Sequence, residues 1–291
     1  QALGFKLMGY HMNAGHSAFL TLALLRRYAH PSEGLRPGES PYDLPQVREL
    51  CTFTTHTPVE AGHDKFDYEL VRRIYGDLLD PGTVKLLAGE DKLNMTRLAL
   101  NLSEYVNGVA KRHAEVSRLM FPGYAVHAVT NGVHAATWTS SPIAKMYDQL
   151  VPGWCHEPEL LSRADRIPDE KLWAVHQEAK LALVDKVREL TGVVLNPDQP
   201  ILGFARRMTA YKRADLLFTD LARLKAIARE RPLQIVMAGK AHPKDAAGKQ
   251  LIEALHGHMR DLAGVVPMAF LPDYDMALAL LMVSGSDVWI N

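Results

Sequence analysis

The sequence of 291 residues is poor in several features that would assign it to a class at once. Its two cysteines, Cys51 and Cys155, are too few and too far apart for a disulfide framework, which fits a reducing compartment. No apolar run approaches the length of a membrane span, and no signal peptide opens the chain. We therefore expect a soluble, cytoplasmic protein that does not contact a membrane.

An excess of charge of either sign is also absent. Thirty-three acidic residues balance thirty-three basic ones, so no overall field attracts the chain to nucleic acid or to anionic lipid. We expect no nucleic-acid partner, and any electrostatic function must come from local clusters of charge.

The common catalytic motifs are missing as well. There is no G-x-G-x-x-G for a dinucleotide, no phosphate-binding G-x-x-x-x-G-K-[ST] and no G-x-S-x-G nucleophile elbow. The thirteen histidines form no H-E-x-x-H, and neither cysteine lies at ligand spacing, so we expect no metal. Asp64, Asp67 and Glu69 would supply carboxylates for glycoside hydrolysis, but they are more typical of a solvated helix start.

What the chain does contain is the composition of a protein with a substantial core, 47% hydrophobic and 23% charged. Its last ninety residues alternate between apolar runs and amphipathic segments, which predicts a parallel sheet in an α/β fold. The strands are expected at 201–205, 233–238, 265–270 and 287–290, and the helices at 214–229, 244–262 and 273–283.

The earlier part of the chain is less regular. Strands are expected at 7–12, 50–54 and 125–130, and helices at 68–75, 94–120 and 168–190, with Ser17 as the cap of a further helix that contains Phe19 and Leu22. Asn107-Gly108 is expected to kink or break the helix at 94–120. The pattern changes near residue 131, where we place a domain boundary.

The segment at 201–213, ILGFARRMTAYKR, is the most informative. Its apolar strand ends at Arg206 and Arg207, and Lys212 and Arg213 follow closely. In an open α/β sheet this is the edge at which ligands bind, and cations near a helix N-terminus suit a phosphate. The alternative is a loop whose charges are merely solvated.

Three other loops also follow predicted strands, at 13–16, 55–58 and 131–134, and they carry asparagine and histidine. These side chains offer donors and acceptors in fixed planes, which suits sugar hydroxyl groups. Each loop alone is more typical of a structural turn. The prediction of a site therefore depends on the set.

These residues resemble the α-glucan (glycogen and maltodextrin) phosphorylases, and most of all their shorter bacterial and archaeal branch. The likeness covers essentially the whole chain, in family order. Besides G-F-A-R-R-M-T-A-Y-K-R, it is carried by H-M-N-A-G-H-S-A-F-L (11–20), F-T-T-H-T-P-V-E-A-G-H-D-K-F (53–66), V-N-G-V-A-K-R-H-A-E-V-S (106–117), N-G-V-H-A-A-T-W (131–138), A-G-K-A-H-P (238–243) and the closing D-V-W-I-N.

The resemblance implies the GT-B fold, in which two Rossmann-like domains face a cleft. Residues 1–130 would be the later part of the N-terminal, glucan-binding domain. Residues 131–291 would be the first part of the C-terminal domain, which binds pyridoxal 5′-phosphate and phosphate. The implied reaction is reversible phosphorolysis of the terminal α-1,4-linked glucose of a glucan, with retention, to give α-glucose 1-phosphate. Family members are commonly homodimers.

The resemblance also implies roles for six residues. His56 matches the histidine that contacts the transferred glucose through its backbone carbonyl, and Asn131 matches the asparagine that binds the 6-hydroxyl. Arg207 and Lys212 match the pair that clamps the substrate phosphate and the cofactor phosphate. His16 and Tyr211 would line the site.

Two departures qualify this picture. The animal and plant enzymes have His-Glu where this chain has Thr209-Ala210, which changes the hydrogen bonding near the phosphate. The glycine-rich phosphate loop and the lysine that forms the Schiff base are expected before Gln1 and after Asn291. We therefore interpret the chain as part of a longer enzyme and expect this piece alone to be inactive.

Two other functions remain open. One is a nucleotide-sugar-dependent glucan synthase of the same fold, although the K-x-G-G loop of the synthases is not recognisable here. The other is a non-catalytic glucan-binding remnant, for which Arg207 and Lys212 would have no use.

Overall fold

The computed structural model describes residues 4, 6–31, 33, 35–36, 39–56, 58–76 and 79–290. The chain divides into two compact units, unit 1 at Gln1–Gly132 and unit 2 at Val133–Asn291. Each unit contains its own four-stranded sheet, and in both sheets every pair of neighbouring strands is parallel. The expected α/β class with parallel sheets is confirmed.

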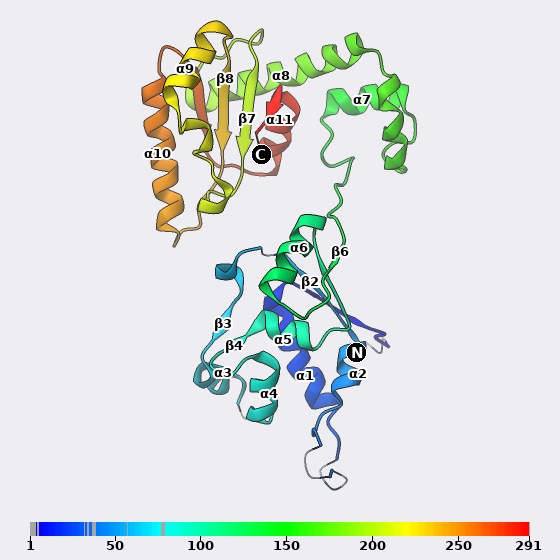
Figure 1. The fold of residues 1–291 in the computed structure, drawn as a ribbon. Helices are drawn as coiled ribbons and strands as arrows, with labels where there is room; N and C mark the ends of the chain where they lie inside the picture. The colour runs from blue at the N-terminus through cyan, green and yellow to red at the C-terminus, as the bar shows by residue number, and fades with distance from the viewer. Residues whose placement is uncertain are drawn as a thin grey trace. The chain divides into compact units, whose positions relative to one another are not determined.

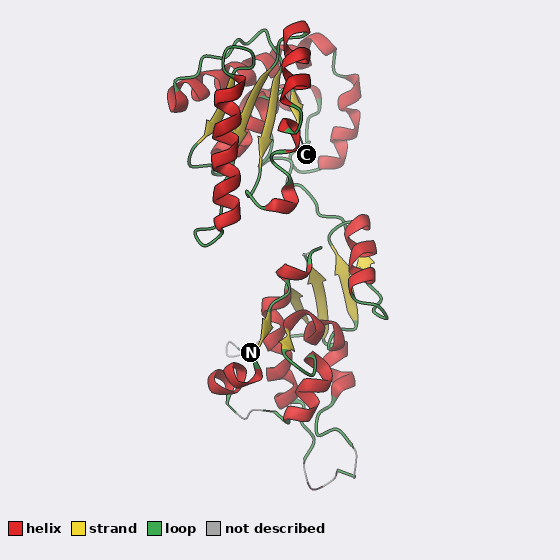
Figure 2. Cartoon of the chain, turned by 60° about the vertical axis from the view of Figure 1, so that its left-hand side comes forward, coloured by secondary structure: helices red, strands yellow, loops and turns green. Residues whose placement is uncertain are grey.

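Unit 1 is built on the sheet order β1-β2-β5-β6. Figure 2 shows these strands running in the same direction, with helices packed around them. The strands are β1 (Tyr10–Asn13), β2 (Cys51–Thr55), β5 (Tyr105–Gly108) and β6 (His127–Ala128). A small antiparallel pair is formed by β3 (Lys65–Phe66) and β4 (Leu93–Asn94).

The helices of unit 1 supply most of its single core, which gathers around Met12, Phe53 and Leu98. All three of these side chains are fully buried. The helices are α1 (Phe19–Arg27), α2 (Leu44–Glu49), α3 (Tyr68–Tyr75), α4 (Pro81–Ala88), α5 (Met95–Asn101) and α6 (Lys111–Met120), and the short 3-10 turns are η1 (Gly15–Ala18) and η3 (Glu60–Gly62).

The structure corrects two expectations for unit 1. The helical region expected at 94–120 is interrupted at Asn107-Gly108 as expected, but the interruption is a strand, Tyr105–Gly108, which pairs with β2 and buries Val106. Asn107 is accommodated in this strand because its side-chain oxygen accepts a hydrogen bond from the Thr54 hydroxyl at 2.9 Å. Ser17 lies inside η1, and its hydroxyl donates back to Ala14 O, so it does not cap α1.

Unit 2 begins with α7 (Ser141–Leu150), η4 (Pro158–Arg166) and α8 (Asp169–Thr191). Its sheet has the order β10-β7-β8-β9. The strands are β7 (Ile201–Ala205), β8 (Gln234–Ala238), β9 (Met268–Leu271) and β10 (Val288–Trp289), and the connections contain η5 (Ala210–Lys212), η6 (Leu216–Phe218), α9 (Leu221–Glu230), α10 (Ala246–Leu262) and α11 (Met276–Gly285).

The sheet of unit 2 is covered on both faces, which is why its strands are apolar runs rather than alternating patterns. One core contains Leu224 of α9 and Leu255 of α10, and another contains Leu183 of α8 and Met282 of α11. Figure 1 shows α9 and α10 on one side of β7 and β8, with α8 and α11 on the other. All five residues of β8 are buried.

The order of the strands creates a switch point. From β7 the chain adds β8 and then β9 on one side, whereas β10 returns to the other side of β7. Connections therefore diverge in opposite directions at the carboxyl ends of β7 and β10, which is where open α/β sheets form their ligand crevice. The cationic segment at 206–213 starts at this point.

Candidate active site

The backbone of the cationic segment is held by the neighbouring loop that follows β8. Arg206 N donates to Ala238 O at 3.3 Å, and Met208 N donates to Lys240 O at 3.0 Å. The approach requires a glycine at 239, where φ is 155° and a Cβ atom would lie 2.1 Å from Arg206 O. This contact gives the A-G-K-A-H-P motif a structural role beside the site.

The four cations of this segment are not neutralised locally. Among the residues that the structure describes, none of Arg206, Arg207, Lys212 and Arg213 forms an ion pair with a carboxylate. Lys212 instead contacts the ring of Tyr211, whose centroid lies 4.8 Å from Nζ. A group of unpaired cations at a switch point is an electrostatic site for an anion.

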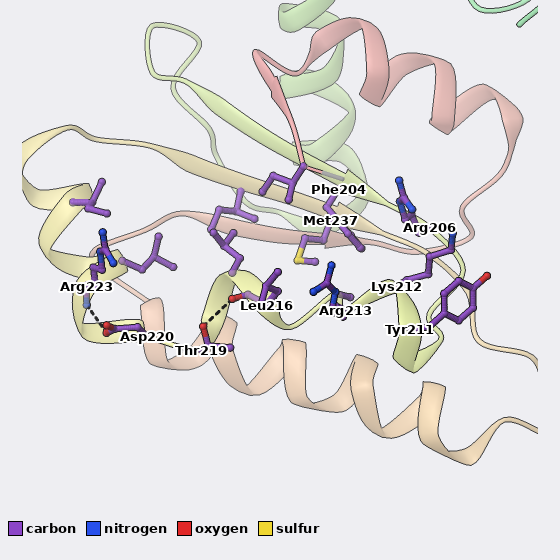
Figure 3. Close-up of a pocket in the computed structure, with 16 residues that line it drawn as sticks. Phe204, Arg206, Tyr211, Lys212, Arg213, Leu216, Thr219, Asp220, Arg223 and Met237 are labelled. Carbon is purple, nitrogen blue, oxygen red and sulfur yellow. Dashed lines mark hydrogen bonds between the residues drawn. The ribbon is translucent and has the colours of Figure 1, made fainter. Parts of the chain in front are cut away.

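A cavity of about 530 Å³ lies beside this segment. Figure 3 shows Phe204 and Met237, from strands, on its apolar floor. The side chains of Arg206, Lys212 and Arg213 lie toward one end of the cavity, and Arg223 and Asp220 lie at the other end. Ile290, just after β10, also lines the cavity, so it borders both strands of the switch point. Of the side chains assigned by resemblance, Tyr211 and Lys212 line this cavity.

Arg207 is exposed and does not line the cavity, whereas Arg206 and Arg213 do. The sequence showed all four cations but could not tell which of them face the cavity. The clamp formed by Arg207 and Lys212 thus stays a prediction, and Arg206 and Arg213 join the candidate site.

The helix expected directly after these cations starts later than predicted, and the helix N-terminus beside them is that of α10, whose Gly248 lies against Met208 O. The helix predicted at 214–229 is interrupted, and α9 begins only at Leu221. Asp220 fixes this start because its carboxylate accepts the Arg223 N–H at 2.9 Å. Arg213 has a φ of 49°, and this left-handed residue separates η5 from η6.

The cavity has the chemistry that pyridoxal phosphate would need. At roughly 30 Å³ for each water-sized group, 530 Å³ holds about eighteen such groups, enough for a phosphorylated ring. Phe204 and Met237 offer apolar contacts to a ring, and Lys212 and Arg206 offer charge to its phosphate. The residues that are present fit the group.

In unit 1, two of the predicted loops meet at the carboxyl edge of the sheet. His56 follows β2, and its Nε2 is hydrogen-bonded to the side-chain oxygen of Asn13 at the end of β1. Because an amide oxygen accepts, the neutral ring carries its hydrogen on Nε2 and leaves Nδ1 as an acceptor. Ala14 N also donates to Thr54 O at 3.0 Å, and the exposed His16 follows in η1.

The third loop lies at the same edge. Asn131 N donates to Val109 O at 3.0 Å, which ties this residue to the segment after β5 and leaves its side chain exposed. His134, the histidine of the same motif, closes a local turn in which its Nδ1 lies 2.7 Å from the Thr137 hydroxyl. His16, His56 and Asn131 are therefore all placed by the carboxyl ends of unit 1's parallel strands.

Sequence reasoning missed the side chains that support this edge. Asn13 positions the His56 ring, and a hydrogen-bonded row runs from His11 Nε2 to Thr54 Oγ1 at 2.8 Å and on to Asn107. The available signal was the alternation of polar residues along β1 and β2, which places them on one face of adjacent strands.

The described parts of the chain contain no cluster of three or more His, Cys, Asp or Glu side chains that could hold a metal ion. The helices of the same residues include none with the length and apolar character that a membrane span needs.

Comparison with known proteins identifies the family of this chain. The carbohydrate phosphorylase family model matches residues 46–289. The chain is 34% identical to a glycogen phosphorylase of Aquifex aeolicus, over all of this chain and 47% of that protein. It is 37% identical to a maltodextrin phosphorylase of Thermococcus litoralis, over 99% of this chain and 38% of that protein.

A glycogen phosphorylase of Mycobacterium tuberculosis is 34% identical over 97% of this chain and 37% of its own length. The chain thus spans between about two fifths and one half of the curated relatives that it matches. Its parallel α/β units are consistent with the GT-B fold of phosphorylases. Because the family model covers most of the sequence, the chain belongs to the carbohydrate phosphorylase family.

Proposed function

We propose that the complete protein catalyses phosphorolysis of terminal α-1,4-linked glucose from glycogen or maltodextrin, with retention, to give α-glucose 1-phosphate. The observation that carries this proposal is the set of four cations after β7, none of which pairs with a carboxylate among the described residues. A phosphate that stays anionic during the reaction needs such a site, and a neutral glucan does not. The names of the relatives support the same reaction.

The proposed roles divide between the two units. In unit 1, His56 and Asn131 bind the transferred glucose, and His16 lines its site. In unit 2, Arg207 and Lys212 hold phosphate, with Tyr211 beside them. Positive charge that is fixed before the reaction stabilises the anion that faces a developing oxocarbenium ion.

Pyridoxal phosphate is part of this proposal. When bound, its phosphate serves as a proton donor and acceptor for the substrate phosphate. Lys212 and Arg206 would hold the cofactor phosphate at the cavity, and Arg207 would bind the substrate phosphate. A homodimer and a cytoplasmic location complete the proposal.

The test is an assay of the complete protein with maltodextrin, in the presence and absence of inorganic phosphate. We expect glucose 1-phosphate only when phosphate is present, together with the absorbance of a bound pyridoxal group. Chain extension that depends on a nucleoside diphosphate sugar would instead establish the synthase. Binding of maltodextrin without either reaction would establish a non-catalytic remnant.

A further inference from the structure

Arg213 combines three features, and the proposed function assigns it no separate role. It lines the cavity of about 530 Å³, its backbone is left-handed, and it forms no ion pair with a carboxylate among the described residues. Apart from glycines, the described residues with a positive φ are Ala14, Arg213 and Asp273, and of these only Arg213 lines this cavity. A strained backbone beside a ligand site points to a functional reason for the residue.

The conformation of Arg213 is fixed from both sides. Its φ and ψ are both 49°, and its N–H donates to Ala210 O at 3.1 Å, which closes η5. Its carbonyl oxygen accepts from Leu216 N at 3.0 Å, at the start of η6. The next residue, Ala214, is 3% exposed and packs in a core of unit 2. A right-handed backbone at residue 213 would break these turns or displace Ala214 from the core.

Arginine is not the residue that this backbone favours. Glycine adopts the left-handed region without a steric cost, and asparagine adopts it more readily than most other residues. The turn alone would therefore be satisfied by glycine or asparagine. Arginine adds a guanidinium group, whose donors form a planar fork that matches the oxygens of a phosphate.

The surroundings of the Arg213 side chain are positive. Figure 3 shows it with Arg206 and Lys212 toward one end of the cavity, whereas Asp220 lies at the other end. Asp215, the nearest acidic residue in the sequence, does not line the cavity. Arg213 is exposed, so a ligand that enters from solvent can reach its guanidinium group. Three cations at one end of a cavity suit a phosphate dianion better than a neutral ligand.

We propose that Arg213 is a further phosphate-binding residue of this site, and that its left-handed backbone holds the guanidinium group at the cationic end of the cavity. This inference rests on the proposed function, because the phosphate is that of the pyridoxal group or the inorganic phosphate substrate. Arg213 adds charge-assisted hydrogen bonds to those of Arg206 and Lys212.

The experiment is a binding titration of the complete protein after its pyridoxal group has been removed. The probes are pyridoxal 5′-phosphate, pyridoxal, which has the same ring without the phosphate, and inorganic phosphate. Arg213→Gly and Arg213→Asn both suit the left-handed backbone, and we expect each to bind pyridoxal 5′-phosphate about tenfold more weakly. Their affinity for pyridoxal should be unchanged. Arg213→Lys keeps the charge and should lose less affinity.

A matched control separates the charge from the backbone strain. Asp273→Gly relieves another left-handed residue, with a φ of 52°, that does not line the cavity, so its affinity for all three probes should be unchanged. Thermal melts establish that each variant is folded. We expect Arg213→Gly to melt no lower than the parent protein, because glycine removes the steric cost at this position.

The outcomes distinguish the source of the phosphate. Weaker binding of inorganic phosphate alone would assign Arg213 to the substrate phosphate rather than to the cofactor phosphate. Unchanged affinity for both phosphate probes in folded Arg213→Gly and Arg213→Asn would overturn the proposal and leave the proposed function standing. A parent protein that binds neither phosphate probe would instead contradict the proposed function, and this inference with it.

Discussion

Asp287 joins three parts of unit 2 through hydrogen bonds. Its carboxylate accepts from Lys180 Nζ at 2.8 Å, from His176 Nε2 at 3.0 Å and from Ile201 N at 2.7 Å. Lys180 is only 2% exposed, and Asp287 is the carboxylate with which it pairs. Burial pushes the pKa of Asp287 upward, but the bonds from Lys180, His176 and Ile201 outweigh it and leave the pKa below its usual value.

We expect Asp287→Asn to lower the free energy of unfolding by about 3 kcal/mol or more, because it leaves the Lys180 charge buried without its partner. A depressed folded-state pKa stabilises the protein above the unfolded value, here 3.8, and this contribution is lost as pH falls through the folded pKa. The variant should therefore show a weaker acid dependence below about pH 4. Urea unfolding at several pH values measures both effects.

The matched control is the exposed pair of Asp185 and Arg188, at 3.0 Å with side chains more than 60% exposed. Asp185→Asn should change stability by less than about 1 kcal/mol. Equal changes in the free energy of unfolding for Asp287→Asn and Asp185→Asn would show that the buried network stabilises the protein no more than an exposed ion pair does.

The two cysteines should differ sharply in reactivity. Burial raises the pKa of Cys51 to about 11, and its side chain lies in the core of unit 1, whereas Cys155 is exposed. Because the thiolate is the reactive form, we expect an alkylating reagent at pH 8 to modify Cys155 quickly and Cys51 only after denaturation. Peptide mass spectrometry reads each site separately. Comparable labelling of both in the native protein would contradict this packing.

At the scale of elements, aspartate caps organise the helices of unit 2. Asp245 Oδ1 accepts the Gly248 N–H at 2.9 Å and starts α10 directly after the loop that supports the cationic segment. We expect Asp245→Ala to cost about 1 kcal/mol and to speed hydrogen exchange in the first turn of α10, whereas Asp245→Asn should preserve both. Unchanged exchange in the alanine variant would mean that this cap is dispensable.

Elements were predictable where local pattern and packing agree. The strand at 201–205 and the helix at 68–75 occur as expected, because an apolar run and an amphipathic period each select one structure. The strand at Tyr105–Gly108 was not predictable, because its formation depends on pairing with β2, far away in the sequence. The segments on either side form α5 and α6, and their helical pattern hid the strand between them, although a break at Asn107-Gly108 was expected.

The candidate site, too, was predictable only in part. The type of chemistry was visible in the sequence, because four cations follow a core strand. The direction of each side chain was not, because it depends on the turn at Arg213 and on contact with the loop after β8. Likewise, the pairing of Asn13 with His56 joins two loops that only the register of β1 and β2 brings together.

At the scale of the whole molecule, the proposed function assigns sugar binding to the strand-end edge of unit 1 and phosphate binding to that of unit 2. Both are formed by the carboxyl ends of parallel strands, and both contain side chains with spare hydrogen-bonding or charge capacity. The central claim is that the cations after β7 bind phosphate. In the alternative interpretation, the charges of this loop are merely solvated and bind no phosphate.

The most direct test is the dependence of phosphorolysis on phosphate concentration in the complete protein, measured for Arg207→Ala and Lys212→Ala. We expect each to lower kcat/KM for phosphate by about a hundredfold or more, with the fold intact by circular dichroism. Arg229→Ala, an exposed arginine of α9 away from the cavity, should leave it unchanged. An unchanged kcat/KM for phosphate in both Arg207→Ala and Lys212→Ala would contradict phosphate binding by these cations.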